Sequence, residues 1–129
     1  MKIKSIAIVL FVMAINAVSA QSTFDKWPAI KAFHEVMSAT FHPSESGNLE
    51  PVKSRSEELM NRAIDVLKSD IPAEYRTPAI LASAEKLQLK SKALHKMVAA
   101  KASDSEITKS LSELHDVFHD IVGLCSEKK

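Results

Sequence analysis

Apolar residues recur at spacings of three and four along four separate segments of this chain. The first segment shows the pattern clearly, with Trp27, Ile30, Phe33, Met37 and Phe41 in succession. This spacing places the side chains on one face of a helix. Only 2 glycines occur in the sequence, and its dominant residue types favour helix over strand. We therefore expect an all-α fold in which each helix buries one stripe.

Stop and start signals bound the first two expected helices. The first covers residues 24–41 and ends at His42-Pro43, because the residue before a proline disfavours the α conformation. The second begins near Asn48, a good N-cap, and has Pro51 in its first turn. These signals therefore predict a turn between the two helices at residues 44–47.

The remaining helices also have recognisable beginnings. The third follows Thr77-Pro78, a threonine cap with proline at the first helical position. The fourth follows Ser103, which has capping-box spacing to Glu106. Four helices of similar length with short connections predict an antiparallel up-down-up-down four-helix bundle over residues 21–129.

Residues 1–20 have the three parts of a secretory signal peptide. Lys2 and Lys4 form a basic start, residues 5–17 are almost entirely apolar, and small residues lead to Ala20. The apolar run is shorter than the roughly 20 residues of a membrane span. We expect cleavage after Ala20, a periplasmic or secreted protein, and no stable membrane insertion afterwards.

Charge and cysteine content exclude several classes of function. Without Lys2 and Lys4, 15 basic residues stand against 16 acidic ones, a net charge of −1 that gives no nucleic-acid footprint. The single cysteine, Cys125, excludes an internal disulfide; we favour a buried apolar role, with pairing in a homodimer or ligation as alternatives. With no Gly-rich phosphate loop and no Ser-His-Asp order, we predict that the chain is not an enzyme.

Histidines are the candidate ligands. His115 and His119, in the stretch LHDVFHD, are four residues apart and share a helix face. His115 lies about 40° around the fourth helix from Leu111, and His34 lies about 40° from Ile30 on the first. All three are thus expected near buried stripes, with His119 on the flank.

An antiparallel arrangement would bring these histidines to one level of the bundle. The start of the first helix then lies beside the end of the last, so that His34 approaches His115 and His119. Met37 and Met60 are possible soft fourth ligands. Three imidazoles with a thioether suit copper, and three imidazoles with water suit zinc or copper. The alternative is that these are ordinary histidines at the edge of the core.

Two further histidines have other expected roles. His42 lies about 12 Å along the helix axis from His34, so we do not expect them to share one metal. A C-terminal cap is favoured for His42, and a second site with Glu45 or Glu50 is the alternative. His95 is expected to be exposed on the Lys-rich face of the third helix.

An exported four-helix chain with candidate axial ligands on its first and last helices resembles the cytochrome b562 and cytochrome c′ group of periplasmic bundles. The c-type members carry a Cys-x-x-Cys-His haem attachment, whereas residues 122–127 read VGLCSE, which excludes covalent haem. The b562 pattern has a methionine early in the first helix, where this chain has Trp27. The resemblance implies non-covalent haem b held by His34 and by His115 or His119.

These observations support three hypotheses. The first is a binding protein for copper or zinc, serving sequestration or delivery. The second is an electron-transfer protein with non-covalent haem b. The third is a cofactor-free bundle that interacts with an envelope protein or acts like a chaperone.

Overall fold

The computed structural model describes residues 21–126, which contain helices and no strand. This confirms the all-α class; the predicted signal peptide, residues 1–20, lies outside the described part. No helix in the described range is both long enough and apolar enough to cross a bilayer. The elements are α2 (Pro28–Glu45), α3 (Glu50–Lys68), the 3₁₀ helix η1 (Ala73–Tyr75), α4 (Pro78–Ala99) and α5 (Asp104–Ser126).

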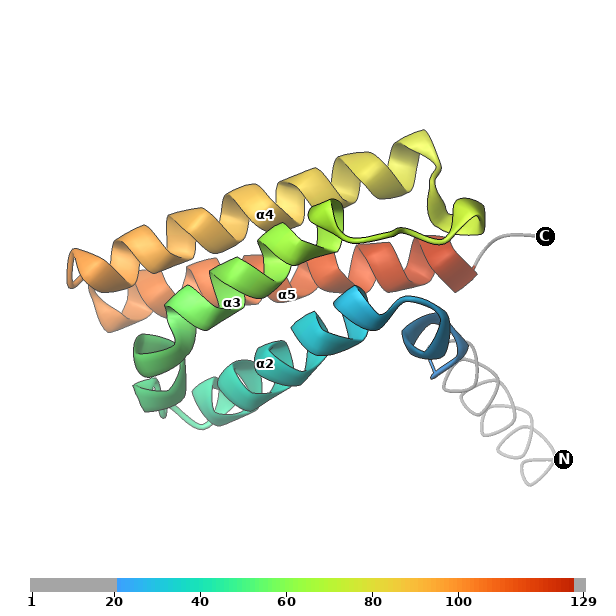
Figure 1. The fold of residues 1–129 in the computed structure, drawn as a ribbon. Coiled ribbons are helices and arrows are strands. Elements are labelled where there is room, and N and C mark those ends of the chain that lie inside the picture. The colour runs from blue at the N-terminus through green and yellow to red at the C-terminus, as the bar shows by residue number, and fades with distance from the viewer. Residues whose placement is uncertain (1–20, 127–129) are drawn as a thin grey trace, which may run out of the picture.

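The long helices lie alongside one another, and helices that follow each other in the chain are neighbours in space (Figure 1). Extensive contacts join α2 to α3, α3 to α4, and α4 to α5. The first and last of these helices, α2 and α5, also touch, but much less extensively. The α2–α5 seam is therefore the loosest of the four main helix–helix contacts.

The predicted stripes form the core. On every long helix, the apolar positions expected from the spacing are buried or half-buried. The fully buried large side chains include Trp27, Ile30, Phe33, Met37, Leu59, Leu87, Leu94, Leu111, Leu114 and Ile121. Ile71, just before η1, and Tyr75, within η1, also belong to this core. The Tyr75 ring stacks on Trp27, with centroids 5.8 Å apart. The connection between α3 and α4 thus closes one end of the core.

The first helix was predicted over residues 24–41, and both of these ends were wrong because of the effects of Pro28 and Pro43. Residues 21–26 are helical, but Trp27 leaves the helical conformation at φ −127° and ψ 84°, and α2 starts at Pro28. The residue before a proline is pushed out of the α region, and proline is well suited to the first helical position. At the other end, Pro43 lies inside α2, which continues to Glu45.

Hydrogen bonds to the last carbonyl groups of α2 close the helix after Pro43. The Pro43 carbonyl accepts from the backbone N–H groups of Ser46 and Asn48 at 3.1 and 3.0 Å. The Ser44 hydroxyl donates to the Phe41 carbonyl. Gly47 follows with a φ of +86°, a left-handed conformation that glycine adopts without strain. The helix therefore ends at Glu45 and not at residue 41, about one helical turn later than predicted.

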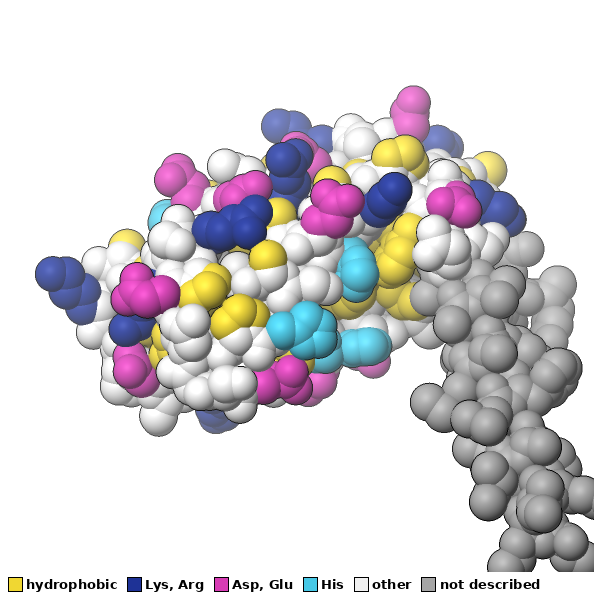
Figure 2. Space-filling view, turned by 90° about the horizontal axis from the view of Figure 1, so that it is seen from below, with side chains coloured by type: hydrophobic (Ala, Val, Ile, Leu, Met, Phe, Trp, Pro, Cys, Tyr) yellow, Lys and Arg dark blue, Asp and Glu magenta, His cyan; other side chains and the backbone are white. Residues whose placement is uncertain are grey.

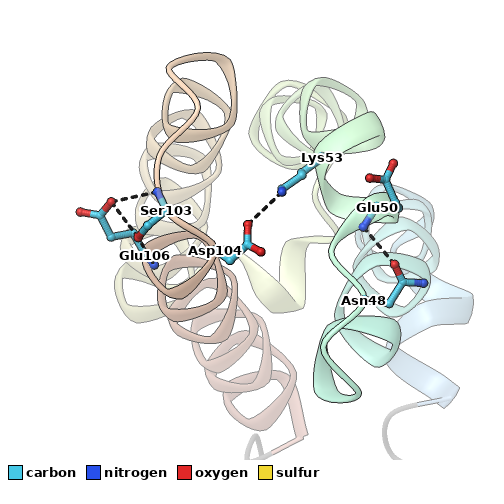
Figure 3. A network of polar contacts seen from close by, with 6 residues as sticks. All are labelled: Asn48, Glu50, Lys53, Ser103, Asp104 and Glu106. Carbon is cyan, nitrogen blue, oxygen red and sulfur yellow. Dashed lines mark hydrogen bonds and ion pairs between the residues drawn. The ribbon is translucent and has the colours of Figure 1, made fainter.

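Polar side chains before α3 and α5 accept hydrogen bonds from N–H groups in the first turn of each helix (Figure 3). The N-cap of α3 is Leu49, one residue after the predicted Asn48, and its side chain makes no cap hydrogen bond. Ser103 and Glu106 form the predicted capping box: the Ser103 N–H donates to Glu106 Oε1 at 3.1 Å, and the Glu106 N–H donates to Ser103 Oγ at 3.2 Å. Asn48 Oδ1 accepts from the Glu50 N–H at 3.1 Å. Lys53 and Asp104 form an exposed ion pair at 2.9 Å, which joins the starts of the two helices.

Candidate functional site

One pocket lies on the α2–α5 seam. Its volume is about 220 Å³. Side chains from α2 and α5 alone line it, and half of them are histidines. In the view from below, histidine side chains gather on this face beside hydrophobic ones (Figure 2). The lining residues are His34, Met37, Ser38, Phe41, His42, His115, Phe118 and His119.

Helical spacing explains why these residues share the pocket. His34, Ser38 and Phe41 succeed one another at spacings of four and three, and Met37 and His42 flank that line. On α5, His115 and His119 are again four apart, with Phe118 between them. The α2–α5 contact is the least extensive of the four main helix contacts, and the lining of the pocket at this seam is mostly imidazole and phenyl rings.

His115 and His119 lie close together on α5. Their ring centroids are 4.4 Å apart and their planes are inclined by 76°. His115 is half-buried and stacks flat on Phe41, with centroids 3.7 Å apart and planes 4° from parallel, whereas His119 is exposed. A metal ion bound by imidazole lies about 2.0–2.1 Å from each nitrogen. Rings this close and inclined can therefore reach one ion with small side-chain rotations.

His34 is held from α2 by its neighbours. Its ring lies 4.6 Å from that of Phe24 and 5.4 Å from that of Phe118, nearly parallel to both. Its Nε2 is 3.2 Å from the Ser38 hydroxyl, one turn along the helix. The imidazole is thus oriented by two stacking contacts and one hydrogen bond.

Burial lowers the pKa values of His34 and His115, which favours their neutral imidazole forms. The pKa of His34 is lowered mainly by desolvation, with Glu35 opposing the shift and His119 and His42 adding to it. Neutral imidazole is the form that binds metals, so both side chains are available as ligands at neutral pH.

The same causes act on His115, and they reveal which charges lie near it. Desolvation lowers its pKa most, and nearby His119 lowers it further. Asp116 and Glu45 oppose this shift. A carboxylate from the end of α2 therefore lies within electrostatic reach of the histidine pair on α5.

His42 lies on the wall of this pocket. It is in the last turn of α2, as expected for a histidine near a helix C-terminus, and its side chain is 70% exposed. Its Nδ1 is 3.3 Å from Glu45 Oε1. From their distance along the helix, His42 and His34 were not expected to share a metal. Both nevertheless line this pocket.

The other candidate residues have different surroundings. Met37 is 1% exposed and forms part of the inner wall of the pocket. Met60 is half-buried on α3 and does not line it. His95 was expected to be exposed, and this was wrong: it is half-buried, with Nδ1 2.9 Å from the Ser56 hydroxyl across the α3–α4 seam. The small, buried Ser56 leaves room for the ring.

Cys125 is buried in α5, as favoured from the sequence. Desolvation, with a smaller contribution from Glu74, raises its pKa to about 11. The thiol is therefore protonated at neutral pH and is a poor nucleophile.

Side-chain rotation is required before the pocket could hold an ion. Within residues 21–126, no group of three or more His, Cys, Asp or Glu side chains is already placed as a metal site. The sequence analysis placed Phe41 on the buried stripe of the first helix but did not predict that it stacks on His115, or that Phe118 stacks on His34.

Comparisons of the chain with protein-family models, with curated proteins and with solved structures find no match. Function is therefore inferred from the side chains of the pocket.

Proposed function

We propose that this chain is an exported, antiparallel up-down-up-down four-helix bundle that binds a transition metal ion, copper or zinc. The ligands are His34, His115 and His119, and the role is sequestration or delivery. The pattern of residues 1–20 supports export, and the contacts between consecutive helices support the bundle. The observation that carries the metal proposal is the gathering of imidazoles from α2 and α5 around one pocket.

His115 and His119 are the first ligands in this proposal. They come from one helix, lie 4.4 Å apart and need only local rotation to face one ion. His34 joins as the third ligand by turning away from the Ser38 hydroxyl, a contact of 3.2 Å that is confined to α2. Metal binding would thus tie α2 to α5 across the seam where their direct contact is least extensive.

The size of the pocket favours an ion over haem. Sites for drug-sized molecules and cofactors typically measure roughly 300–1,000 Å³, and this pocket measures about 220 Å³. Phe41 and Phe118 already stack on the imidazoles that a haem would need. Haem b would have to displace these rings, whereas a single ion requires only imidazole rotation.

Metal titration of the mature chain tests this proposal. Zn²⁺ and copper should each bind, and His115→Ala and His119→Ala should each weaken binding by more than about tenfold, since even the loss of an outer partner typically costs 10–100-fold. His95→Ala is the matched control, because it removes a half-buried imidazole from a different seam. Unchanged metal affinity in both α5 variants would rule out His115 and His119 as ligands.

Two further measurements on the same protein distinguish the other two hypotheses. A Soret band after haemin is added, lost in His34→Ala, would favour the haem protein. If the protein binds neither metal nor haem, and its unfolding temperature is unchanged by a chelator, the cofactor-free interaction bundle is favoured.

A further inference from the structure

The pocket presents its potential donors in order of increasing exposure. Met37, at 1% exposed, belongs to the inner wall. His34 and His115 are half-buried, and His119 and His42 are exposed at the outside. The thioether residue is therefore the most buried of these donors, and the exposure to water increases from His34 and His115 to the outer rings.

The lining is uncharged when the imidazoles are neutral. Thioether, imidazole, hydroxyl and phenyl groups make up its described side chains, and none of them is a carboxylate. Glu35 and Glu45 of α2 and Asp116 of α5 act electrostatically on the imidazoles but do not line the pocket. Glu45 is 58% exposed and pairs with His42 at 3.3 Å. A cation bound against Met37 would thus have no anionic ligand to offset the loss of its hydration.

Charge strongly affects the stability of a cation in such a place. The free energy of moving an ion into a medium of low polarity grows with the square of its charge, so a divalent ion loses far more than a monovalent one. Phe41 and Phe118 add an apolar wall that limits access of water. Neutral donors behind aromatic rings therefore favour a singly charged ion.

Ligand type points in the same direction. Thioether sulfur is a soft donor that suits Cu(I), whereas protein zinc sites use thiolate, imidazole and carboxylate ligands. Met37 is also the one sulfur-bearing residue among those lining the pocket. Its α2 stripe neighbours Ile30 and Phe33 show that hydrocarbon side chains fill equivalent buried positions on this helix.

We infer that the pocket binds Cu(I) in preference to Zn²⁺, with the Met37 sulfur as inner ligand and His115 and His119 as outer ligands. This inference rests on the proposed function and specifies the ion that the same site selects. The ion binds as Cu(I) and remains Cu(I), so the site itself performs no electron transfer. His34 closes the site from α2.

Met37→Leu tests the inference, because leucine keeps the apolar volume and removes the sulfur. Met60→Leu is the matched control, since Met60 is half-buried on α3 and outside the pocket. Affinities for Cu(I), measured anaerobically against a competing chelator, and for Zn²⁺ are compared in the mature chain. We expect Met37→Leu to weaken Cu(I) binding by about tenfold or more, with Zn²⁺ binding unchanged. Met60→Leu should alter neither.

The outcomes separate the two proposals. If neither ion binds the unaltered protein, the proposed function fails. If both ions bind but Met37→Leu leaves Cu(I) affinity unchanged, or weakens both ions equally, the metal site stands and the selectivity inference is overturned.

X-ray absorption of the copper-loaded protein covers the case in which Met37→Leu does not fold. The measurement is made in a Cys125→Ala background, so that the buried thiol cannot supply the signal. A sulfur neighbour of Cu(I) supports the inference. A shell of nitrogen and oxygen neighbours alone overturns it.

Discussion

Two seams of the molecule use the same pair of residue types in different ways. In the α3–α4 seam, His95 meets the Ser56 hydroxyl at 2.9 Å, and the histidine on one helix completes a hydrogen bond with the other. In the α2–α5 seam, His34 meets Ser38 at 3.2 Å within α2 itself. The first contact joins two helices, whereas the second orients a ring toward a pocket.

The difference lies in how closely the helices approach. α3 and α4 contact each other extensively, so the position of the His95 side chain between them is restricted, and its hydrogen-bond partner is Ser56. α2 and α5 touch less, and the space between them holds several imidazoles and phenyl rings. A histidine in a close seam contributes to packing, and a histidine in a loose seam remains available to a ligand.

The largest expected contrast is in stability. Leu87→Ala, at a fully buried position of α4, should lower the free energy of unfolding by about 2–5 kcal/mol. Phe41→Ala should have a smaller effect in the metal-free protein, because the ring is half-buried and borders the pocket. Urea denaturation measures both. Equal losses would show that the two seams are packed equally well.

The next contrast is the gain in stability when metal binds. At a free metal concentration about 100 times the dissociation constant, binding should add about 2.7 kcal/mol to the free energy of unfolding. His115→Ala should remove about half of this gain or more, because a tenfold weaker affinity leaves about 1.4 kcal/mol at the same metal concentration. His95→Ala should retain the gain, because His95 does not line the pocket. Thermal unfolding with and without zinc provides the measurement. If His95→Ala abolishes the gain in stability and His115→Ala does not, the ion binds in the α3–α4 seam, which contradicts the proposed site.

Removing each hydroxyl gives a smaller effect with a predicted order. Ser56→Ala leaves the half-buried His95 ring without its partner and should cost about 1–3 kcal/mol. Ser38→Ala should cost less, because His34 keeps its two stacking neighbours and borders the pocket. Chemical denaturation of the two variants side by side tests the order, and a larger loss for Ser38→Ala contradicts it.

The smallest expected effect is a dependence of stability on pH. The pKa values of His34 and His115 are lowered from the ordinary value of 6.5, so between the lowered values and 6.5 the unfolded chain binds more protons than the folded one. Metal-free protein should therefore lose stability as pH falls below about 6.5. Replacing both histidines with glutamine should flatten this slope, whereas His95→Gln should not. An unchanged slope in the double variant would rule out these two groups as its source.

Much of the fold follows from local patterns in the sequence. Apolar spacing identified the buried faces, and Ser103 and Thr77 marked helix starts that the structure confirms. Proline was harder to interpret. Pro28 separates residues 21–26 from α2, while Pro43 lies in the last turn of α2, where its own carbonyl accepts hydrogen bonds from Ser46 and Asn48. Position within the helix decided the outcome, and the residue type alone did not.

The pocket was only partly predictable. Helical angles placed His34 and His115 near the core, and both are half-buried beside the same pocket. The flat stack of Phe41 on His115 depends on how far apart α2 and α5 lie, which no local pattern encodes. His95 was misjudged for a similar reason, since its burial depends on the small Ser56 side chain of another helix. Local periodicity thus found the helix faces, and the spacing between helices decided which histidines share a pocket.

Elemental analysis of the tag-free mature protein, purified after export without chelators, tests the central claim most directly. The α2–α5 pocket predicts about one copper or zinc ion per chain, present in the unaltered protein and in His95→Ala, and absent when His115 and His119 are both replaced with alanine. Protein that carries no metal, and that retains none after copper and zinc are offered, would contradict the claim. His115 and His119 would then be ordinary histidines at the edge of the core.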